Sequence, residues 1–292
     1  MRHADTETGR RRMSDSQPAP DGVDLDKPNA ARIYDWLLGG TANWAIDREF
    51  GAKAVETFPL APILARTNRE FLGRGVHHLA SLGVEQFLDL GSGVPTVGNV
   101  HEVADRVNPR SRCVYVDVEP VAVAHAKVLL ERHGDPERHA VVQGDLRDVE
   151  KIWERALDTG VLDPAKPIAL ILVAVLHFIA TEDRPHDVVG RYRDLLPAGS
   201  YLLSSHGTED GTPRDEAAKR AELREQYNQS GNIVHLRSRT EFGRFFTGFE
   251  LVEPGLVWLP EWHLDELPSP ASEALTSNPA ESCGLGALGR KP

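Results

Sequence analysis

Between residues 86 and 204, short apolar segments alternate with segments whose apolar residues follow helical spacing. Strands that alternate with helices pair in parallel, because each crossover returns the chain to the same edge of the sheet. Helices then cover both faces of that sheet, so the alternation predicts an α/β fold. The expected strands lie at residues 87–90, 113–116, 140–142, 168–175 and 200–204, with helical spacing around residues 97–107 and 121–128.

The first expected strand runs into a glycine-rich turn and then toward a helix. Gly91 and Gly93 flank Ser92, and glycine permits both a tight turn and a close approach of a ligand to the backbone. The N–H groups at a helix N-terminus bind anions, and open α/β sheets bind nucleotides at the carboxyl ends of their strands. A dinucleotide motif would carry a third glycine at Thr96, so its absence disfavours NAD and FAD.

Acidic residues end the next two expected strands. Asp117 stands where a carboxylate accepts hydrogen bonds from ribose hydroxyls, although Asp is also a common cap for the helix that follows. Asp145 can accept the amino proton of an adenine while Leu146 packs on the ring. Because the carboxyl ends of parallel strands meet at one edge, three such strand ends favour one shared site over separate helix caps.

These motifs resemble those of class I S-adenosylmethionine-dependent methyltransferases. More narrowly, the chain resembles an actinobacterial S-adenosyl methyltransferase family over roughly residues 26–262. The resemblance implies an α/β, Rossmann-like class I methyltransferase fold with a seven-stranded, mostly parallel sheet, an antiparallel last strand from a hairpin at residues 249–259, and an N-terminal helical lid. The segments that carry it are residues 28–40, 43, 47–49, 68–72, 86–96, 101–103, 175–179 and 249–257.

The resemblance implies S-adenosylmethionine as cofactor and S-adenosylhomocysteine as its product. Gly91, Ser92 and Gly93 would hold the methionine part of the cofactor, Asp117 the ribose, and Asp145 with Leu146 the adenine. Asp89 would orient the amino group through its charge. The further candidates for cofactor contact are Val118, Val173, Arg32, Tyr34 and Asn43.

Three helices are predicted before the first strand, at residues 30–37, 47–58 and 62–82. Polar and aromatic residues are dense at positions 29–47, which favours a lid that closes over the cofactor and excludes water from it. The alternative is a packed helix in which Tyr34 and Trp36 are core aromatics.

His177 follows the fourth expected strand and is the candidate general base for an oxygen or nitrogen nucleophile. The alternative is a structural histidine, which is the commoner role at an apolar strand end. His206, after the fifth strand, is the weaker catalytic candidate. Since His235 and His263 show no metal-ligand spacing with an acid or a cysteine, no metal site is predicted.

The expected organisation is a disordered tail at residues 1–23, a helical lid at 24–84, the core at 85–267 and a flexible tail at 268–292, which is rich in proline and glycine. No apolar run is long enough for a membrane span, and the N-terminus has no apolar signal segment, so we expect a cytoplasmic protein. The net charge of −11 disfavours nucleic acid as a partner. No pattern indicates an oligomeric state.

Two functions are consistent with these features. The first is methyl transfer from S-adenosylmethionine to a small-molecule acceptor by in-line displacement, which requires positioning and desolvation more than a protein nucleophile. The second is a regulatory protein that binds S-adenosylmethionine or its product without turnover. A deep acceptor pocket beside the cofactor would favour the enzyme. A nicotinamide-dependent oxidoreductase ranks last, because the third glycine is missing.

Overall fold

The computed structural model describes residues 23–96, 98–212 and 214–292. The tail predicted at residues 1–23 therefore lies outside the described residues, apart from Val23. Over the described residues the strands form one eight-stranded sheet in the order β3-β2-β1-β4-β5-β8-β6, with β7 paired to β8. The strands are β1 Gln86–Leu90, β2 Arg112–Asp117, β3 His139–Gln143, β4 Ala169–Val173, β5 Tyr201–Gly207, β6 Glu250–Leu251, β7 Val257–Trp258 and β8 Gly284–Arg290.

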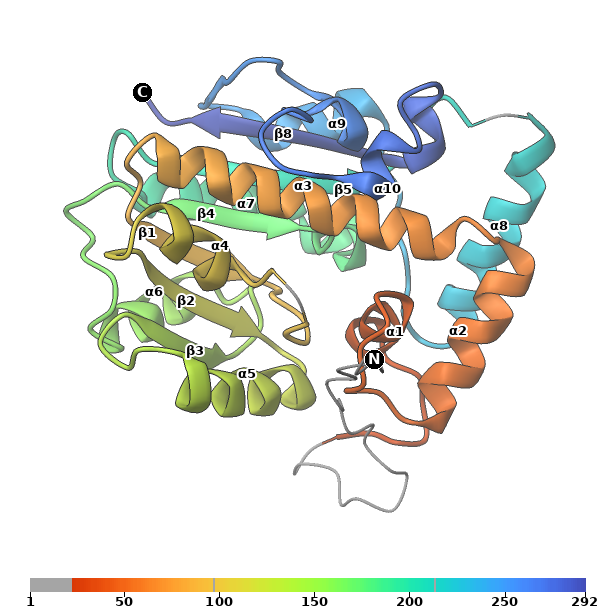
Figure 1. Cartoon of the computed structure of the whole chain (residues 1–292), viewed down its shortest axis with the longest axis horizontal. Coiled ribbons are helices and arrows are strands. Elements are labelled where there is room, and N and C mark those ends of the chain that lie inside the picture. Colours follow the sequence, from red (N-terminus) through yellow and green to blue (C-terminus); the bar gives the residue numbers. More distant parts are fainter. Residues whose placement is uncertain (1–22, 97, 213) are drawn as a thin grey trace, which may run out of the picture.

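The predicted parallel half of the sheet is confirmed. β1 pairs with β2 and β4, and the outer pairs β2–β3 and β4–β5 are parallel as well. Every residue of β1 is buried, Gln86 and Asp89 included, because parallel strands are covered on both faces. All five parallel strands point their carboxyl ends toward the same edge of the sheet (Figure 1).

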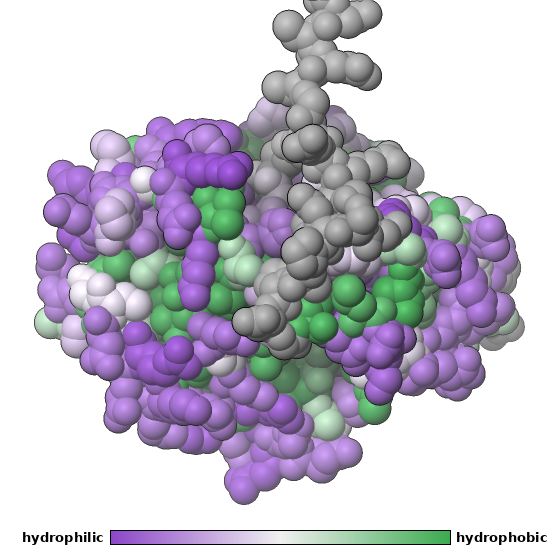
Figure 2. Space-filling model, turned by 90° about the horizontal axis from the view of Figure 1, so that it is seen from below, coloured by the Kyte–Doolittle hydropathy of each residue, from purple (hydrophilic) through white to green (hydrophobic). Residues whose placement is uncertain are grey.

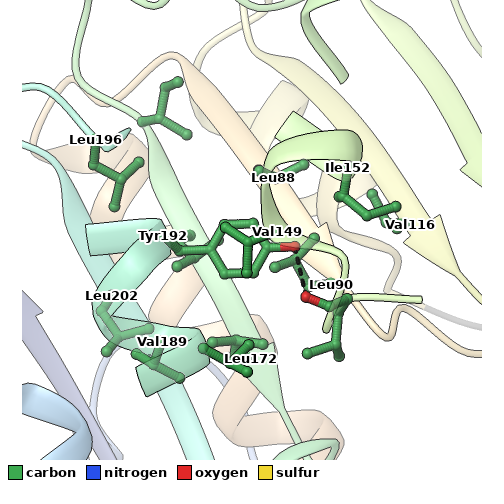
Figure 3. Close-up of a cluster of buried hydrophobic side chains, with 14 of the residues drawn as sticks. Leu88, Leu90, Val116, Val149, Ile152, Leu172, Val189, Tyr192, Leu196 and Leu202 are labelled. Carbon is green, nitrogen blue, oxygen red and sulfur yellow. Dashed lines mark hydrogen bonds between the residues drawn. The ribbon is translucent and has the colours of Figure 1, made fainter. Parts of the chain in front are cut away.

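Helices pack on both faces of the sheet. One buried cluster joins the sheet to α6 and α7, and Figure 3 shows its centre, where the Tyr192 hydroxyl donates to the Leu146 carbonyl at 2.9 Å. A second cluster joins the other face to α3, α4 and α5. The helices that cover the two faces are α3 Ala61–Ser81, α4 Val100–Val107, α5 Pro120–His133, α6 Val149–Asp158 and α7 Pro185–Leu195.

A helical lobe, formed by α1 Ala30–Leu37, α2 Ala45–Thr57 and α8 Arg214–Gln229, stands beyond the carboxyl ends of the parallel strands (Figure 1). Its apolar contacts include the edge-to-face pair of Phe50 on α2 and Tyr227 on α8, at 4.9 Å between ring centroids. The bounds of α1, α2 and α3 agree closely with the predicted helices. However, α3 lies across the sheet (Figure 1), so residues 24–84 are not one cap.

The prediction of a flexible tail at residues 268–292 is wrong. β8 lies between β5 and β6, pairs antiparallel with β5 along its whole length, and is buried over Gly284–Gly289. Two short helices, α10 Pro270–Glu273 and η5 Pro279–Ser282, lead into it. Glycines disfavour strands on propensity grounds, but here they serve close packing: a Cβ at Gly286 would lie 2.6 Å from Cε2 of Phe71.

The hairpin predicted at residues 249–259 is also absent from the described residues. β6 and β7 come from that segment, but each pairs with β8 and not with the other. The antiparallel strands at the end of the sheet, which the resemblance implied, are therefore present, and β8 supplies the strand beside β5. No helix among the described residues combines the length and apolar character needed to cross a bilayer.

A polar stripe on α3 holds the segment that leads into β8. The buried Arg74 guanidinium donates to the carbonyls of Trp262 and Leu259, both at 2.7 Å. One turn earlier, the Glu70 carboxylate accepts from the backbone N–H groups of Ala271 and Ser272 at 2.9 and 2.7 Å. These bonds explain why a segment rich in proline and serine is ordered.

Candidate functional site

A cavity of about 700 Å³ lies at the carboxyl ends of β1 to β5, a size typical of ligand sites. The helical lobe, the start of α3 and the loop at residues 231–236 form its other walls. Figure 2 shows a face on which hydrophobic surface gathers toward the middle of the molecule with hydrophilic surface around it. The predicted site residues that line the cavity are Tyr34, Asp89, Gly91, Ser92, Gly93, Asp117, Val118, Asp145, Leu146, Val173 and His177.

The turn after β1 has the predicted glycine geometry. Gly91 and Gly93 have φ of 70° and 66°. These values lie in the left-handed region of the backbone, which glycine adopts more readily than other residues. The N–H groups of Gly91 and Ser92 both donate to the Val116 carbonyl on β2, at 2.8 and 3.1 Å. The helix that was expected next begins only at Val100, and its first turn is capped by the side chains of its own capping box. The turn itself, and not the N-terminus of α4, therefore borders the cavity.

Asp117 at the end of β2 borders the cavity and bonds to two backbone N–H groups. Its Oδ1 accepts from the N–H of Glu119 at 2.8 Å, at the start of α5, and its Oδ2 accepts from the N–H of Gly93 at 2.7 Å. Burial raises the pKa of Asp117, and the hydrogen bonds from Glu119 and Gly93 oppose this shift. The carboxylate thus fixes both loops and still borders the cavity.

Asp145 at the end of β3 is held by Arg147. The guanidinium of Arg147 lies 2.6 Å from Oδ2 of Asp145 and 2.7 Å from Asp183. These hydrogen bonds lower the pKa of Asp145, and burial opposes them only in part. Asp145 is therefore a carboxylate at neutral pH and forms an ion pair with Arg147. Both residues line the cavity.

Asp89 in β1 lies in a different environment. It is 6% exposed, and burial raises the pKa of its carboxyl group to about 7. Arg69 on α3 opposes this shift, whereas the charge of Asp117 adds to it. Asp89 is therefore about half protonated at neutral pH and would gain from a nearby cation.

His177 lies in a short 3-10 helix, η1 Leu176–Phe178, just beyond β4. Burial first, and then the charge of Arg237, lowers the pKa of His177 to about 4, so its ring is neutral at pH 7. Its Nδ1 is buried and has no hydrogen-bond partner among the described residues. The neutral imidazole has one nitrogen that can accept a proton, and the residue borders the cavity.

His206 is fully engaged in hydrogen bonds. Its Nδ1 lies 2.7 Å from the Gly207 carbonyl, and its Nε2 lies 3.0 Å from Nη1 of Arg237. Because a carbonyl accepts and a guanidinium donates, the proton of the ring stands on Nδ1. Arg237 also donates to the carbonyls of Leu176 and Ile179, both at 2.9 Å, which anchors η1. His206 and Arg237 therefore form a support beside His177.

Two predicted cofactor contacts, Arg32 and Asn43, do not line the cavity among the described residues. The Arg32 side chain is buried and pairs with Asp47 at 2.9 Å. The Asn43 amide donates to Oδ2 of Asp35 at 2.8 Å and to the Gly40 carbonyl at 3.1 Å. Both hold the start of α1 and the α1–α2 loop in place.

Tyr34, by contrast, does border the cavity, in a chain of hydrogen bonds that the sequence did not predict. The Asn68 amide on α3 donates to the Tyr34 hydroxyl at 2.9 Å, and the Ser205 hydroxyl on β5 donates to Oδ1 of Asn68 at 2.6 Å. Asn68 and Ser205 stand within helical and apolar patterns, so no local signal marks them. The chain links the helical lobe to the sheet across the cavity.

Some residues that line the cavity were not predicted, although the sequence contains a pattern that could have indicated them. Asn29, the N-cap of α1, donates to Oε2 of Glu119 at 2.8 Å, and both line the cavity. Helix α8 is rich in charged residues, but its positions 220, 223, 224 and 227 line the cavity. That spacing places them on one helical face, which would have marked α8 as part of the site.

Five parallel strands, antiparallel strands beyond β5 and acids at the strand ends together define a Rossmann-like methyltransferase fold of class I. A family model described as S-adenosyl methyltransferase matches residues 16–292, and the chain belongs to this family. Membership of this family and the fold together support S-adenosylmethionine-dependent methyl transfer.

Two solved structures are similar over nearly the whole chain. A DUF574 family protein from Streptomyces avermitilis is 36% identical, covers 92% of this chain with 99% of its own length, and superposes with a TM-score of 0.83. A proposed methyltransferase from Thermobifida fusca is 39% identical, with 93% and 97% coverage and a TM-score of 0.81. Both organisms are actinobacteria, as the resemblance implied. No curated protein matches the chain.

Proposed function

We propose that the cavity holds S-adenosylmethionine against the ends of β1, β2 and β3, and a small-molecule methyl acceptor between the helical lobe and β4 and β5. The observation that carries this proposal is that one cavity joins the strand-end acids to an apolar wall. Two reactants can therefore lie side by side in the same enclosed space. The apolar wall includes Leu37, Phe58, Leu64, Leu223 and Leu236.

The residues at the strand ends suit the cofactor. A Cβ at Gly93 would meet nothing within 4 Å, so the backbone there borders open space. Asp89 and Asp117 offer carboxylates to an ammonium and to ribose hydroxyls. Leu146 and Val118 offer apolar surface to a purine, and Val118 is 62% exposed although it lines the cavity. We assign Gly91 and Ser92 to the methionine part and Asp145 to the adenine amino group.

Bound S-adenosylmethionine supplies a methyl group on a positively charged sulfur. Displacement at such a carbon needs no nucleophile from the protein, so the residues of the site act by positioning and by excluding water. The helical lobe excludes water, with the hydrogen bond between Asn29 and Glu119 holding it to the β2–α5 loop. In this proposal the lobe is the lid that the sequence predicted, with α8 added.

We assign the role of general base to His177. Its ring is neutral and borders the cavity, so its nitrogen with a free lone pair suits it to accept a proton from an acceptor hydroxyl or amine as that group is methylated. Arg237 and His206 position η1 and the imidazole. The product that leaves with the methylated acceptor is S-adenosylhomocysteine.

The alternative is a regulator that binds the cofactor without turnover. The apolar end of the cavity favours the enzyme, because a binding protein needs only the end that contacts the cofactor. A titration of the purified protein with S-adenosylmethionine and S-adenosylhomocysteine, beside Asp117→Ala, is the first test. Loss of the ribose contact is expected to weaken binding by about 1–3 kcal/mol.

The matched control is Asp158→Ala, which removes one exposed carboxylate at the end of α6. It is expected to bind as the wild type does. A screen of small-molecule acceptors with a labelled methyl group then tests turnover. Binding without transfer to any acceptor would favour the regulator, and no binding to the wild type would overturn both functions.

A further inference from the structure

Three potential metal ligands converge outside the cavity, where α3 meets the segment that leads toward β8. His78 on α3, His263 and Glu266 each offer one ligand atom, and these atoms lie within 4.8 Å of one another. The sequence predicted no metal site, since His263 showed no metal-ligand spacing with an acid. The fold corrects this view, because Glu266 stands three positions after His263 and α3 brings His78 to both.

The hydrogen bonds fix which nitrogen of His263 carries a proton. Its Nε2 lies 2.8 Å from the Glu253 carbonyl. A carbonyl can only accept, so Nε2 is the donor, and Nδ1 of the neutral ring carries a lone pair. That Nδ1 lies 3.3 Å from Oε1 of Glu266, which is also an acceptor. Two acceptors face each other, and a proton or a metal ion must lie between them.

A second imidazole converges on the same carboxylate oxygen. Nδ1 of His78 lies 2.5 Å from Oε1 of Glu266. The rings of His78 and His263 are 4.5 Å apart between centroids and tilted by 35°. If a proton filled the gap, His263 would be an imidazolium packed against the ring of His78. A divalent cation would replace the hydrogen bond between His78 and Glu266 and would bind all three ligand atoms once these two atoms move apart, without placing a charged ring there.

We propose that His78, His263 and Glu266 bind Zn²⁺. Two imidazole nitrogens and one carboxylate oxygen are a ligand set that zinc uses, with water in the fourth position. The Glu253 carbonyl acts as the outer partner that orients a metal-bound histidine. His77 adds a contact of 3.5 Å to the other Glu266 oxygen. The side chains of His78, Glu266 and His263 are 16%, 21% and 25% exposed, so the ion has a path from solvent.

The bound ion would lie one helical turn beyond the hydrogen bonds of Arg74 on α3 and would extend the same polar stripe. It would tie α3 to the chain segment that leads into β8. The site is distinct from the cavity, since none of its three ligands lines the cavity among the described residues. The proposal is therefore independent of the proposed function.

The test is a titration of metal-free protein, without a histidine tag, with Co²⁺ as a spectroscopic substitute for Zn²⁺. We expect one equivalent to bind with the intense visible bands of a four-coordinate site. His263→Asn and Glu266→Gln should each weaken binding about tenfold or more. Asn tolerates the φ of 44° at position 263, so that variant is expected to fold. His133→Asn, on the exposed end of α5, is the matched control.

A second readout separates metal binding from simple loss of the histidine. Zn²⁺ should raise the thermal unfolding midpoint of the wild type and of His133→Asn, but not that of His263→Asn. Wild-type protein that binds Co²⁺ no better than His263→Asn, or that gives only the weak spectrum of the hydrated ion, would overturn the proposal. A proton on His263 would then be the occupant of the gap.

Discussion

The carboxyl groups at the strand ends lie in contrasting electrostatic environments. Asp89 is buried and its pKa is raised to about 7, whereas Arg147 lowers the pKa of Asp145. A pair of acids with such different protonation suits a ligand with a cationic end and a neutral end. S-adenosylmethionine, with an ammonium at one end and an adenine at the other, has this asymmetry.

The pKa of Asp89 makes cofactor binding depend on pH. Below about pH 7 the carboxyl group of the free protein is protonated, and a ligand ammonium gains only from the ionised form. Binding must then release a proton, so affinity should rise with pH and level off above about 7. Titration with S-adenosylhomocysteine between pH 5.5 and 8.5 measures this pH dependence. Below the pKa, the affinity should change by about tenfold per pH unit at most. Asp89→Asn should flatten the curve, and an unchanged slope would remove Asp89 from the amino-group contact.

The proposed base provides a second prediction. His177→Gln should lower turnover about 100-fold or more, because positioned bases contribute on the order of 10²–10⁴-fold. The affinity for S-adenosylhomocysteine should stay within about threefold. Since the pKa of His177 is about 4, the wild-type rate should not titrate with this group between pH 6 and 8. His133→Gln is the control, and a His177→Gln variant with full turnover would leave the histidine a structural role.

The site residues that belong to a sequence motif could be predicted from the sequence. Properties that depend on neighbours from other elements could not. The glycine turn, Asp117 and Asp145 stand at the positions that the sequence indicated. The raised pKa of Asp89 comes first from its burial, and Arg69 on α3 opposes the shift. Arg32 and Asn43 resemble ligand residues by type alone, but buried partners within the N-terminal segment satisfy them.

Among the elements, β8 packs closely against α3 through its glycines. Gly286 lies against Phe71 and Leu259, and an added Cβ would be 2.6 Å from the Phe71 ring and 3.0 Å from Leu259. Gly286→Ala should therefore destabilise the protein by roughly 1–3 kcal/mol, as overpacked core positions do. Chemical denaturation measures the loss.

Gly190 on α7 is the matched control for this substitution. The nearest atom to an added Cβ there is a guanidinium nitrogen of Arg193 at 3.8 Å, so there is room. Gly190→Ala should be neutral or stabilising by up to about 1 kcal/mol, because alanine favours a helix interior. Equal stability of the Gly286 and Gly190 variants would contradict the packing of β8 against α3.

Elements were predictable where their periodicity was strong. The apolar strands β1 to β5 and the helices α1 to α3 follow their patterns within a few residues. β8 reads Gly-Leu-Gly-Ala-Leu-Gly-Arg, and its glycines resemble a loose tail, because the reason for them lies in Phe71 and Leu259 far away in the chain. Close approach between distant elements leaves no local signal.

At the scale of the whole molecule, the helical lobe and the sheet meet around one cavity. Asn232, in the loop after α8, accepts from the N–H of Ala30 and donates to the Pro28 carbonyl, both at 2.9 Å. The lobe is thus assembled from segments about two hundred residues apart, and the hydrogen bond of Asn29 to Glu119 connects it to the sheet. The sequence patterns predicted the helices α1 and α2. They could not predict that α8 packs beside them.

If the lobe is a lid, S-adenosylhomocysteine should slow amide hydrogen exchange in α1 and in residues 231–236. Asn232→Ala should reduce that protection and weaken binding by about 1–2 kcal/mol, because the hydrogen bonds to Ala30 at the start of α1 and to Pro28 just before it are lost. Gln229→Ala, which removes an amide that donates to Glu225 within α8, is the control. Exchange in α6, on the far face of the sheet, should not change. Equal exchange with and without ligand would mean that the lobe does not close.

The place of β8 in the sheet has a consequence for how the chain folds. Leu203 on β5 pairs with Leu288 on β8, so this edge of β5 stays open until the whole intervening stretch has folded back. Such distant pairing costs loop-closure entropy and slows folding. Meanwhile an apolar strand edge is available to other chains. Refolding yield should therefore depend on protein concentration more steeply than the stability of the finished molecule suggests.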